Sequence, residues 1–112
     1  MPDRMHGINE LLQQKLSHLI QADSEELGIV SVIAVSTSRD LSNAEVLIAP
    51  LSEHNHDRIL KQLERKTYSY RHELLKQLEM RRIPALTFRI DLHREELNRV
   101  EQLLDSVSRE HE

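Results

Sequence analysis

The sequence is poor in the residues that mark secreted proteins, thiol chemistry and phosphate-binding loops. Among 112 residues it contains no cysteine, no tryptophan and two glycines. The lack of cysteine excludes disulfides and thiolate metal sites and is typical of a reducing compartment. Gly7 and Gly28 are too few for a glycine-rich phosphate loop. With one Phe and two Tyr, the core must be built from Leu, Ile, Val and Ala.

Long apolar segments are also lacking. The longest apolar run, residues 28–35, is far shorter than the about 20 residues that a membrane-spanning helix needs. Residues 1–10 lack the apolar segment of a secretory signal. We therefore expect a cytoplasmic protein that does not bind membranes. The length predicts a single domain over residues 1–112, with flexible termini at 1–6 and 109–112.

The periodicity of the apolar residues predicts an α+β fold. Apolar side chains recur every three or four residues in helical segments, whereas β-branched runs bounded by turn formers indicate strands. The predicted elements are a helix at 8–22, strands at 29–35 and 44–50, a helical segment at 58–80, a strand at 83–90 and a helix at 94–110. The first two strands should form a hairpin, and Pro84 is tolerated at the start of the third.

The segment at 58–80 is about twice the usual length of a helix. Its apolar stripe consists of Ile59, Leu63, Thr67, Tyr70, Leu74 and Leu78. One long helix satisfies this spacing, and so do two helices that meet at a bend. Ser52 or Asp57 is the expected N-terminal cap.

Positive charge is concentrated in the same segment. Residues 58–82 hold eight of the fifteen Lys and Arg residues and carry a net charge of +5, in a chain whose net charge is −4. On a wheel of 100° per residue centred on Arg65, five other residues fall within about 40° of it, opposite the apolar stripe. They are Arg58, Lys61, Ser69, His72 and Lys76.

Two interpretations of this charged side are open. A run of charge is usually a solvated surface. A basic stripe on an acidic protein is also the electrostatic footprint of a site for a polyanion. For RNA, the candidate binding residues are Arg58, Lys61, Arg65, Lys66, Tyr68, His72, Lys76, Arg81, Arg82 and Arg39. In this set Tyr68 would stack on a base or ribose, and Arg39 would reach a phosphate from the hairpin tip.

Two motifs resemble the ribosome-binding factor A family. The segment "VSTSRDLSNAEVLIAP" matches the family's strand, turn and strand through Val35, Ser38, Asp40, Leu41, Ala44 and Val46. The segment "YRHELLKQLEMRRIPALTFRID" matches its helix, Arg-x-Pro-x-Leu-x-Phe element and trailing Asp through Arg71, Leu74, Leu78, Arg82, Pro84, Leu86, Phe88 and Asp91. The resemblance covers residues 8–105 in the same order of elements.

This resemblance implies a type II KH-like domain of the order helix, strand, strand, one or two helices, strand, helix. Its three-stranded sheet should carry helices mainly on one face. The implied function is non-enzymatic: binding to immature rRNA of the small ribosomal subunit during late maturation, with support for 5′-end processing and a role in cold adaptation. KH domains generally clamp RNA through a GxxG loop, but this family has a bend at an Ala-x-Gly sequence instead.

Here the chain departs from the family pattern, because Lys66, Thr67 and Tyr68 occupy the Ala-x-Gly positions. A left-handed conformation costs a residue with a side chain about 1–2 kcal/mol, which makes Tyr68 a poor hinge. We therefore expect a gentle bend or a nearly continuous helix.

An alternative function belongs to another class. The helices at 8–22 and 94–110, which lie in acidic segments of the chain (residues 1–28 and 83–112, each of net charge −3), would present the surface of a protein interaction module that does not bind RNA. We expect no metal, no cofactor and no small-molecule substrate, and we expect a monomer. His54 and His56 lack further ligands for a metal site, and Asp40 is expected to close the hairpin turn through its side chain. Arg71 either extends the basic surface or pairs with a carboxylate such as Asp91.

Overall fold

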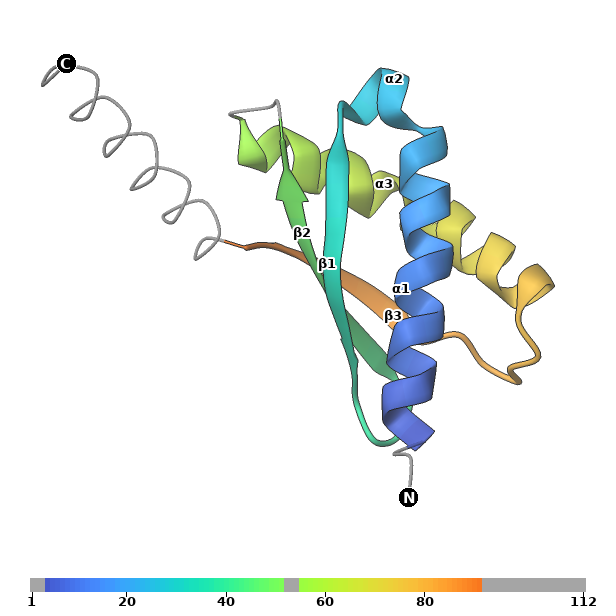
Figure 1. Ribbon diagram of the computed structural model, residues 1–112. Helices are drawn as coiled ribbons and strands as arrows, with labels where there is room; N and C mark the ends of the chain where they lie inside the picture. Colours follow the sequence, from blue (N-terminus) through green and yellow to red (C-terminus); the bar gives the residue numbers. More distant parts are fainter. Residues whose placement is uncertain (1–3, 52–54, 92–112) are drawn as a thin grey trace, which may run out of the picture.

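The computed structural model describes residues 4–51 and 55–91, and Figure 1 shows how their elements are arranged. The elements are α1 (Arg4–Ala22), α2 (Ser24–Leu27), β1 (Val30–Thr37), β2 (Asn43–Pro50), α3 (His56–Gln77) and β3 (Ala85–Ile90). This order confirms the predicted α+β fold. The helix predicted at 94–110 and the terminus at 109–112 lie outside the described residues.

The three strands of the described chain form one sheet in the order β1-β2-β3. β1 and β2 form the predicted antiparallel hairpin, and β2 pairs with β3 in parallel, with Val46 opposite Phe88. A parallel pair needs a long crossover connection, which α3 supplies. The central strand is therefore β2, a point that the periodicity of the sequence had left open.

The hairpin turn is closed by the Asp40 carboxylate, as predicted. Asp40 Oδ1 accepts hydrogen bonds from the hydroxyls of Ser38 and Ser42, both at 2.7 Å, and from the Ser42 backbone N–H at 3.1 Å. Hydrogen bonds from Ser42 and then Ser38 lower the pKa of Asp40 from its ordinary 3.8 to about 2. The turn is thus held by a carboxylate that favours its ionised form.

The core lies on one face of the sheet, under α1 and α3. α1 runs beside β1, and α3 crosses the direction of α1 (Figure 1). Buried side chains from the two helices and the sheet form one cluster: Leu12, Leu16 and Ile20; Ile59, Leu63, Tyr70 and Leu74; Val32, Val46, Ile48, Leu86 and Phe88. The opposite face carries exposed polar groups, among them the Glu45–Arg89 ion pair at 2.8 Å. The predicted one-sided packing is confirmed for the described residues.

The outer edge of β1 is bound by side chains of α1. The pairing of β1 with β2 shifts between Val32 and Ala34, which leaves Ile33 as a bulged residue. Gln13 Nε2 donates to the carbonyl oxygens of Val32 and Ile33, at 3.3 and 3.1 Å, and the Thr37 N–H donates to Asn9 Oδ1 at 3.0 Å. α1 therefore satisfies backbone groups that an edge strand would otherwise expose.

α3 is a single helix of 22 residues, which confirms the expectation of a nearly continuous helix. Lys66, Thr67 and Tyr68 all lie within it, so both halves of the charged side share one phase. The predicted cap was wrong: Asn55 caps the helix, because its side chain accepts a hydrogen bond from the Arg58 N–H at 3.1 Å. Asp57 lies inside the first turn, where a negative charge favours the positive end of the helix dipole, and Ser52 lies outside the described residues.

Candidate nucleic-acid interface

The solvent side of α3 carries an exposed row of cationic and polar side chains, which we call the cationic face: Arg58, Lys61, Arg65, Ser69, His72 and Lys76. The opposite side of the same helix is buried through Ile59, Leu63, Tyr70 and Leu74. Because α3 is one uninterrupted helix, residues from its first to its last turn share this face. The wheel calculated from the sequence therefore describes the folded helix.

Most cations of this face are not neutralised by neighbouring carboxylates. In residues 4–51 and 55–91, no ion pair involves Arg58, Lys61 or Arg65. Lys76 pairs with Glu73 at 3.6 Å, but both side chains are exposed. Exposed pairs of this kind contribute little and exchange readily with other anions. The face therefore has cationic groups available to a polyanionic ligand.

The first half of the cationic face is hollowed into a shallow groove of about 460 Å³. Arg58, Lys61 and Arg65 line it, together with Asn55, Asp57 and Gln62. Three cations against one carboxylate give this groove a net positive charge. Such a concavity suits a phosphate group, because guanidinium and ammonium groups donate charge-assisted hydrogen bonds to phosphate oxygens.

Lys66 does not belong to the cationic face, although the sequence placed it among the candidate RNA-binding residues. Its Nζ lies 2.7 Å from Glu26 Oε2 and 3.8 Å from Asp23 Oδ2, and its side chain is only 22% exposed. The hydrogen bond to Glu26 raises the pKa of Lys66 above its ordinary 10.5. The ammonium group therefore holds α2 against α3 and is committed to carboxylates.

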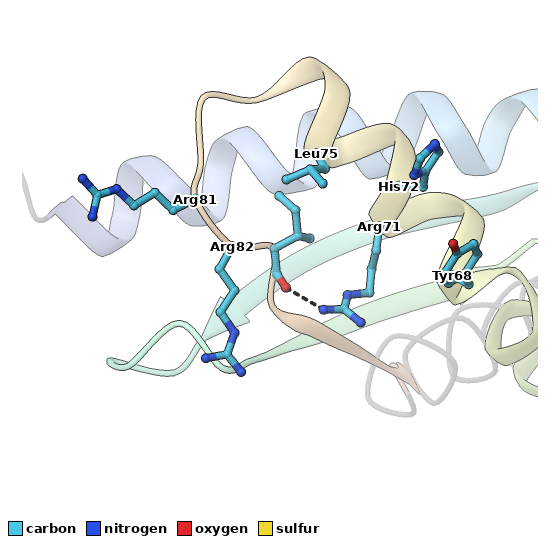
Figure 2. A pocket seen from close by; sticks show the side chains of 7 residues that line it. Tyr68, Arg71, His72, Leu75, Arg81 and Arg82 are labelled. Carbon is cyan, nitrogen blue, oxygen red and sulfur yellow. Dashed lines mark hydrogen bonds between the residues drawn. The ribbon is translucent and has the colours of Figure 1, made fainter.

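The second half of the helix borders a pocket of about 290 Å³, which we call the Tyr68 pocket. Its lining residues, shown in Figure 2, are Tyr68, Arg71, His72, Leu75, Arg81, Arg82 and Ile83. The first four of these residues belong to α3, and the last three belong to the loop that leads to β3. The Tyr68 and His72 rings are nearly parallel, at 6° and with centroids 6.3 Å apart.

Arg71 is fixed at the inner side of this pocket. Its Nη2 donates a hydrogen bond of 2.8 Å to the Ile83 carbonyl oxygen, drawn as a dashed line in Figure 2. Its Nε is buried and has no hydrogen-bond partner among the described residues. Arg71 therefore links α3 to the loop before β3 at a position that borders the pocket, and this bond to a backbone carbonyl is neither of the two roles left open for it.

The remaining candidate cations gather near one end of the sheet. Arg81 and Arg82 are exposed in the loop between α3 and β3, whose far end is anchored by the buried Ile83 and Pro84. The Ala85 N–H donates to the Ser42 carbonyl oxygen at 2.9 Å, so this loop ends beside the hairpin turn that carries the exposed Arg39. Two segments far apart in the sequence thus bring cations to the same end of the sheet.

Sequence reasoning missed two residues of the Tyr68 pocket, Leu75 and Ile83, and left the role of Arg71 open. One signal was present for Leu75, which lies four and seven residues after Arg71 and Tyr68 and therefore on their side of the helix. The contribution of Ile83 depends on the path of the loop, which periodicity does not give.

In the described part of the chain, no group of three or more His, Asp or Glu side chains is arranged to hold a metal ion. No described helix is long and apolar enough to span a membrane.

Known proteins with a similar sequence and a similar fold point to one family. The family model described as ribosome-binding factor A matches residues 4–104. The ribosome-binding factor A of Alkalilimnicola ehrlichii is 31% identical over 111 residues, covering 96% of this chain and 85% of the relative. The crystal structure of ribosome-binding factor A from Thermus thermophilus has a TM-score of 0.72 and 27% identity, covering 79% of this chain and 97% of that one.

A second structural match comes from a complex with 30S. It is a homology model of the Thermus thermophilus factor fitted into a cryo-electron-microscopy map of a 30S complex. Its TM-score is 0.63 and its identity 29%, over 72% of this chain and 88% of that one. The fold of the described residues is accordingly the KH-like fold of these relatives. The chain belongs to the ribosome-binding factor A family.

Proposed function

We propose that this protein is a non-enzymatic assembly factor that binds immature rRNA of the small ribosomal subunit during late maturation and supports processing of its 5′ end. It acts as a cytoplasmic monomer. The observation that carries the proposal is the cationic face, a continuous exposed row on one side of α3 whose cations are mostly unpaired within residues 4–51 and 55–91. Membership of the family supports the choice of partner, since a Thermus thermophilus relative is described in complex with the 30S subunit.

The mechanism is occupancy rather than covalent chemistry. Arg58, Lys61 and Arg65 would contact successive phosphates of an rRNA segment, and binding would release the counterions that those phosphates hold. Arg81, Arg82 and Arg39 would extend the contact toward the end of the sheet. An rRNA segment held in this way is kept from wrong pairings until the mature subunit no longer presents it.

The acidic remainder of the chain would set the orientation of binding. Residues 58–82 carry +5 although the whole chain carries −4, so the other segments together are strongly negative. Like charge repels the rRNA backbone from these surfaces, whereas the cationic face attracts it. The electric field of the protein therefore favours encounters in which α3 faces the RNA.

The test is a sucrose gradient of cell extract containing the tagged protein. The proposal predicts that the protein travels with free small subunits and not with translating ribosomes. The double variant Arg65→Glu with Lys76→Glu should lose this association while its thermal unfolding stays cooperative, since both side chains are exposed. Full association of the folded double variant would contradict the proposal.

The same gradient distinguishes rRNA binding from the alternative function, a protein interaction module. In that alternative, helix α1 and residues 94–110 would hold a protein partner, and the second of these segments lies outside the described residues. Association would then survive nuclease treatment and high salt. Loss of association under either treatment is the result that the rRNA-binding proposal predicts, because phosphate contacts weaken steeply with salt.

A further inference from the structure

We propose that the Tyr68 pocket holds one unstacked nucleobase of the bound RNA, with the adjoining phosphates against Arg81 and Arg82. This inference rests on the proposed function and adds a second mode of contact to it. The cationic face contacts the backbone of any RNA, whereas a base pocket selects an RNA in which a nucleotide has left the helical stack. Such a contact would let the factor recognise rRNA that is not yet fully folded.

Tyr68 is the first reason for this assignment. The chain has three aromatic residues, and Tyr70 and Phe88 are buried at 3% and 7% exposure, whereas Tyr68 is 81% exposed. An aromatic side chain left in solvent forgoes the burial that would stabilise the core. The His72 ring lies nearly parallel to the Tyr68 ring beside the same pocket, with the two centroids 6.3 Å apart. Aromatic and imidazole rings of this kind are the platforms on which single-stranded bases stack.

The second reason is the size and composition of the pocket. Its volume of about 290 Å³ is at the lower limit of pockets that hold small ligands, which suits one base and excludes a duplex. Leu75 and Ile83 provide apolar surface, and Leu75 is 50% exposed. A base that enters would cover this surface together with the ring of Tyr68.

Charge identifies the occupant as a nucleotide rather than an apolar side chain of a protein. Among the described residues that line the pocket, three are arginines and none is a carboxylate. Figure 2 shows Arg71 between Tyr68 and Arg82, while Arg81 extends away from the pocket on the loop. Arg71 would donate to acceptor atoms on the edge of the base, and the two loop arginines would meet the phosphates on either side. This combination of flat apolar surface and surrounding cations complements an aromatic ring attached to a phosphate chain.

The test is a thermodynamic cycle between Tyr68 and the base. The probe is an RNA duplex with a single bulged nucleotide. The comparison ligand is the same duplex with an abasic site at the bulge. The intact protein should bind the bulged duplex about 5- to 150-fold more tightly than the abasic one, the range expected for one stacked base. Tyr68→Ala should remove this preference, and Tyr68→Phe should restore it because the phenyl ring still stacks.

A fluorescent base gives an independent readout. Bulged 2-aminopurine is bright when unstacked, and its emission should fall on binding the intact protein but not on binding Tyr68→Ala. Lys61→Gln is the matched control, because a phosphate contact should weaken both duplexes by the same factor. Equal binding of the two duplexes by the intact protein would overturn the pocket while leaving the proposed function standing. Absence of salt-sensitive binding to any of these RNAs, or to small subunits, would overturn both.

Discussion

The Tyr70 hydroxyl donates a hydrogen bond of 2.8 Å to Asp23 Oδ2, joining side chains 47 positions apart in the sequence. Asp23 lies between α1 and α2, and Tyr70 lies on the buried side of α3. The carboxylate that receives this bond also contacts Lys66, which is held by Glu26 as well. These four side chains form a small polar network that fixes α3 against α2 and the junction between α1 and α2. This placement directs the cationic face outward.

The Tyr70 hydrogen bond should contribute measurably to stability. Tyr70→Phe keeps the buried ring but removes a donor to a charged group, so the free energy of unfolding should fall by about 1.5 kcal/mol. Tyr68→Phe is the matched control, because that hydroxyl is on an 81% exposed side chain and its loss should change stability by less than about 0.5 kcal/mol. Urea denaturation of the two variants measures both values. Equal effects of the two substitutions would show that the bond to Asp23 does not stabilise the fold.

Alkaline pH should weaken the folded state through the same residue. Burial, and then the bond to Asp23, raises the pKa of Tyr70 above its ordinary 10.0. The unfolded chain loses this proton first, so the contribution is complete below pH 10 and is lost as the pH rises further. The intact protein should therefore lose stability above about pH 10, by up to about 1.4 kcal/mol per pH unit from this one group. Tyr70→Phe should show a shallower fall in urea denaturation, and an identical fall would contradict the assignment.

The hairpin turn should respond to acid in the opposite sense. The pKa of Asp40 is lowered from 3.8 to about 2, so its contribution is present above pH 3.8 and is lost as the pH falls toward 2. A carboxyl titration followed by NMR should place the midpoint of Asp40 near the lower value. Ser42→Ala removes the hydroxyl donor and should move the midpoint back toward 3.8. A midpoint near 3.8 in the intact protein would mean that the turn does not hold the ionised form.

Neighbouring cations on α3 should have opposite roles. Lys66→Gln breaks the partly buried pair with Glu26 and should lower stability by about 1 kcal/mol while leaving RNA affinity nearly unchanged. Arg65→Gln should leave stability within about 0.5 kcal/mol and reduce the slope of log affinity against log salt by about one. Filter binding across a salt series, with thermal unfolding of both variants, measures the two effects. If both substitutions weakened RNA binding equally, the assignment of Lys66 to the polar network with Asp23 and Glu26 would be wrong.

The sequence predicts α3 well because a helix that packs on one side must repeat its apolar residues every three or four positions. That periodicity gave the stripe of Ile59, Leu63 and Leu74 and, by the same geometry, the angle of each charge on the other side. The side chain at position 68 also predicts continuity of the helix, because a Tyr disfavours the left-handed conformation of a hinge. Local sequence therefore determined both the helix and its charged side.

What the sequence could not supply depends on contacts between distant segments. The wheel places Lys66 about 100° from Arg65, but only the position of α2 shows that Glu26 meets it there. The Tyr68 pocket likewise depends on how the loop through Ile83 returns along α3. The parallel pairing of β3 with β2 follows from the crossover of α3 over the sheet, and apolar spacing within β3 does not reveal it.

The cationic face can be tested most directly by tethered cleavage of rRNA. Because the chain has no cysteine, Ser69→Cys creates a unique attachment point for an iron–EDTA probe at the middle of that face. Ser36→Cys is the matched control, since it is also exposed but lies on β1, away from α3. Bound to immature small subunits, the Ser69 probe should cut the rRNA backbone at a localised position and the Ser36 probe should not. Cleavage from Ser36 alone, or equal cleavage from both positions, would show that the outer side of α3 is not where this protein meets RNA.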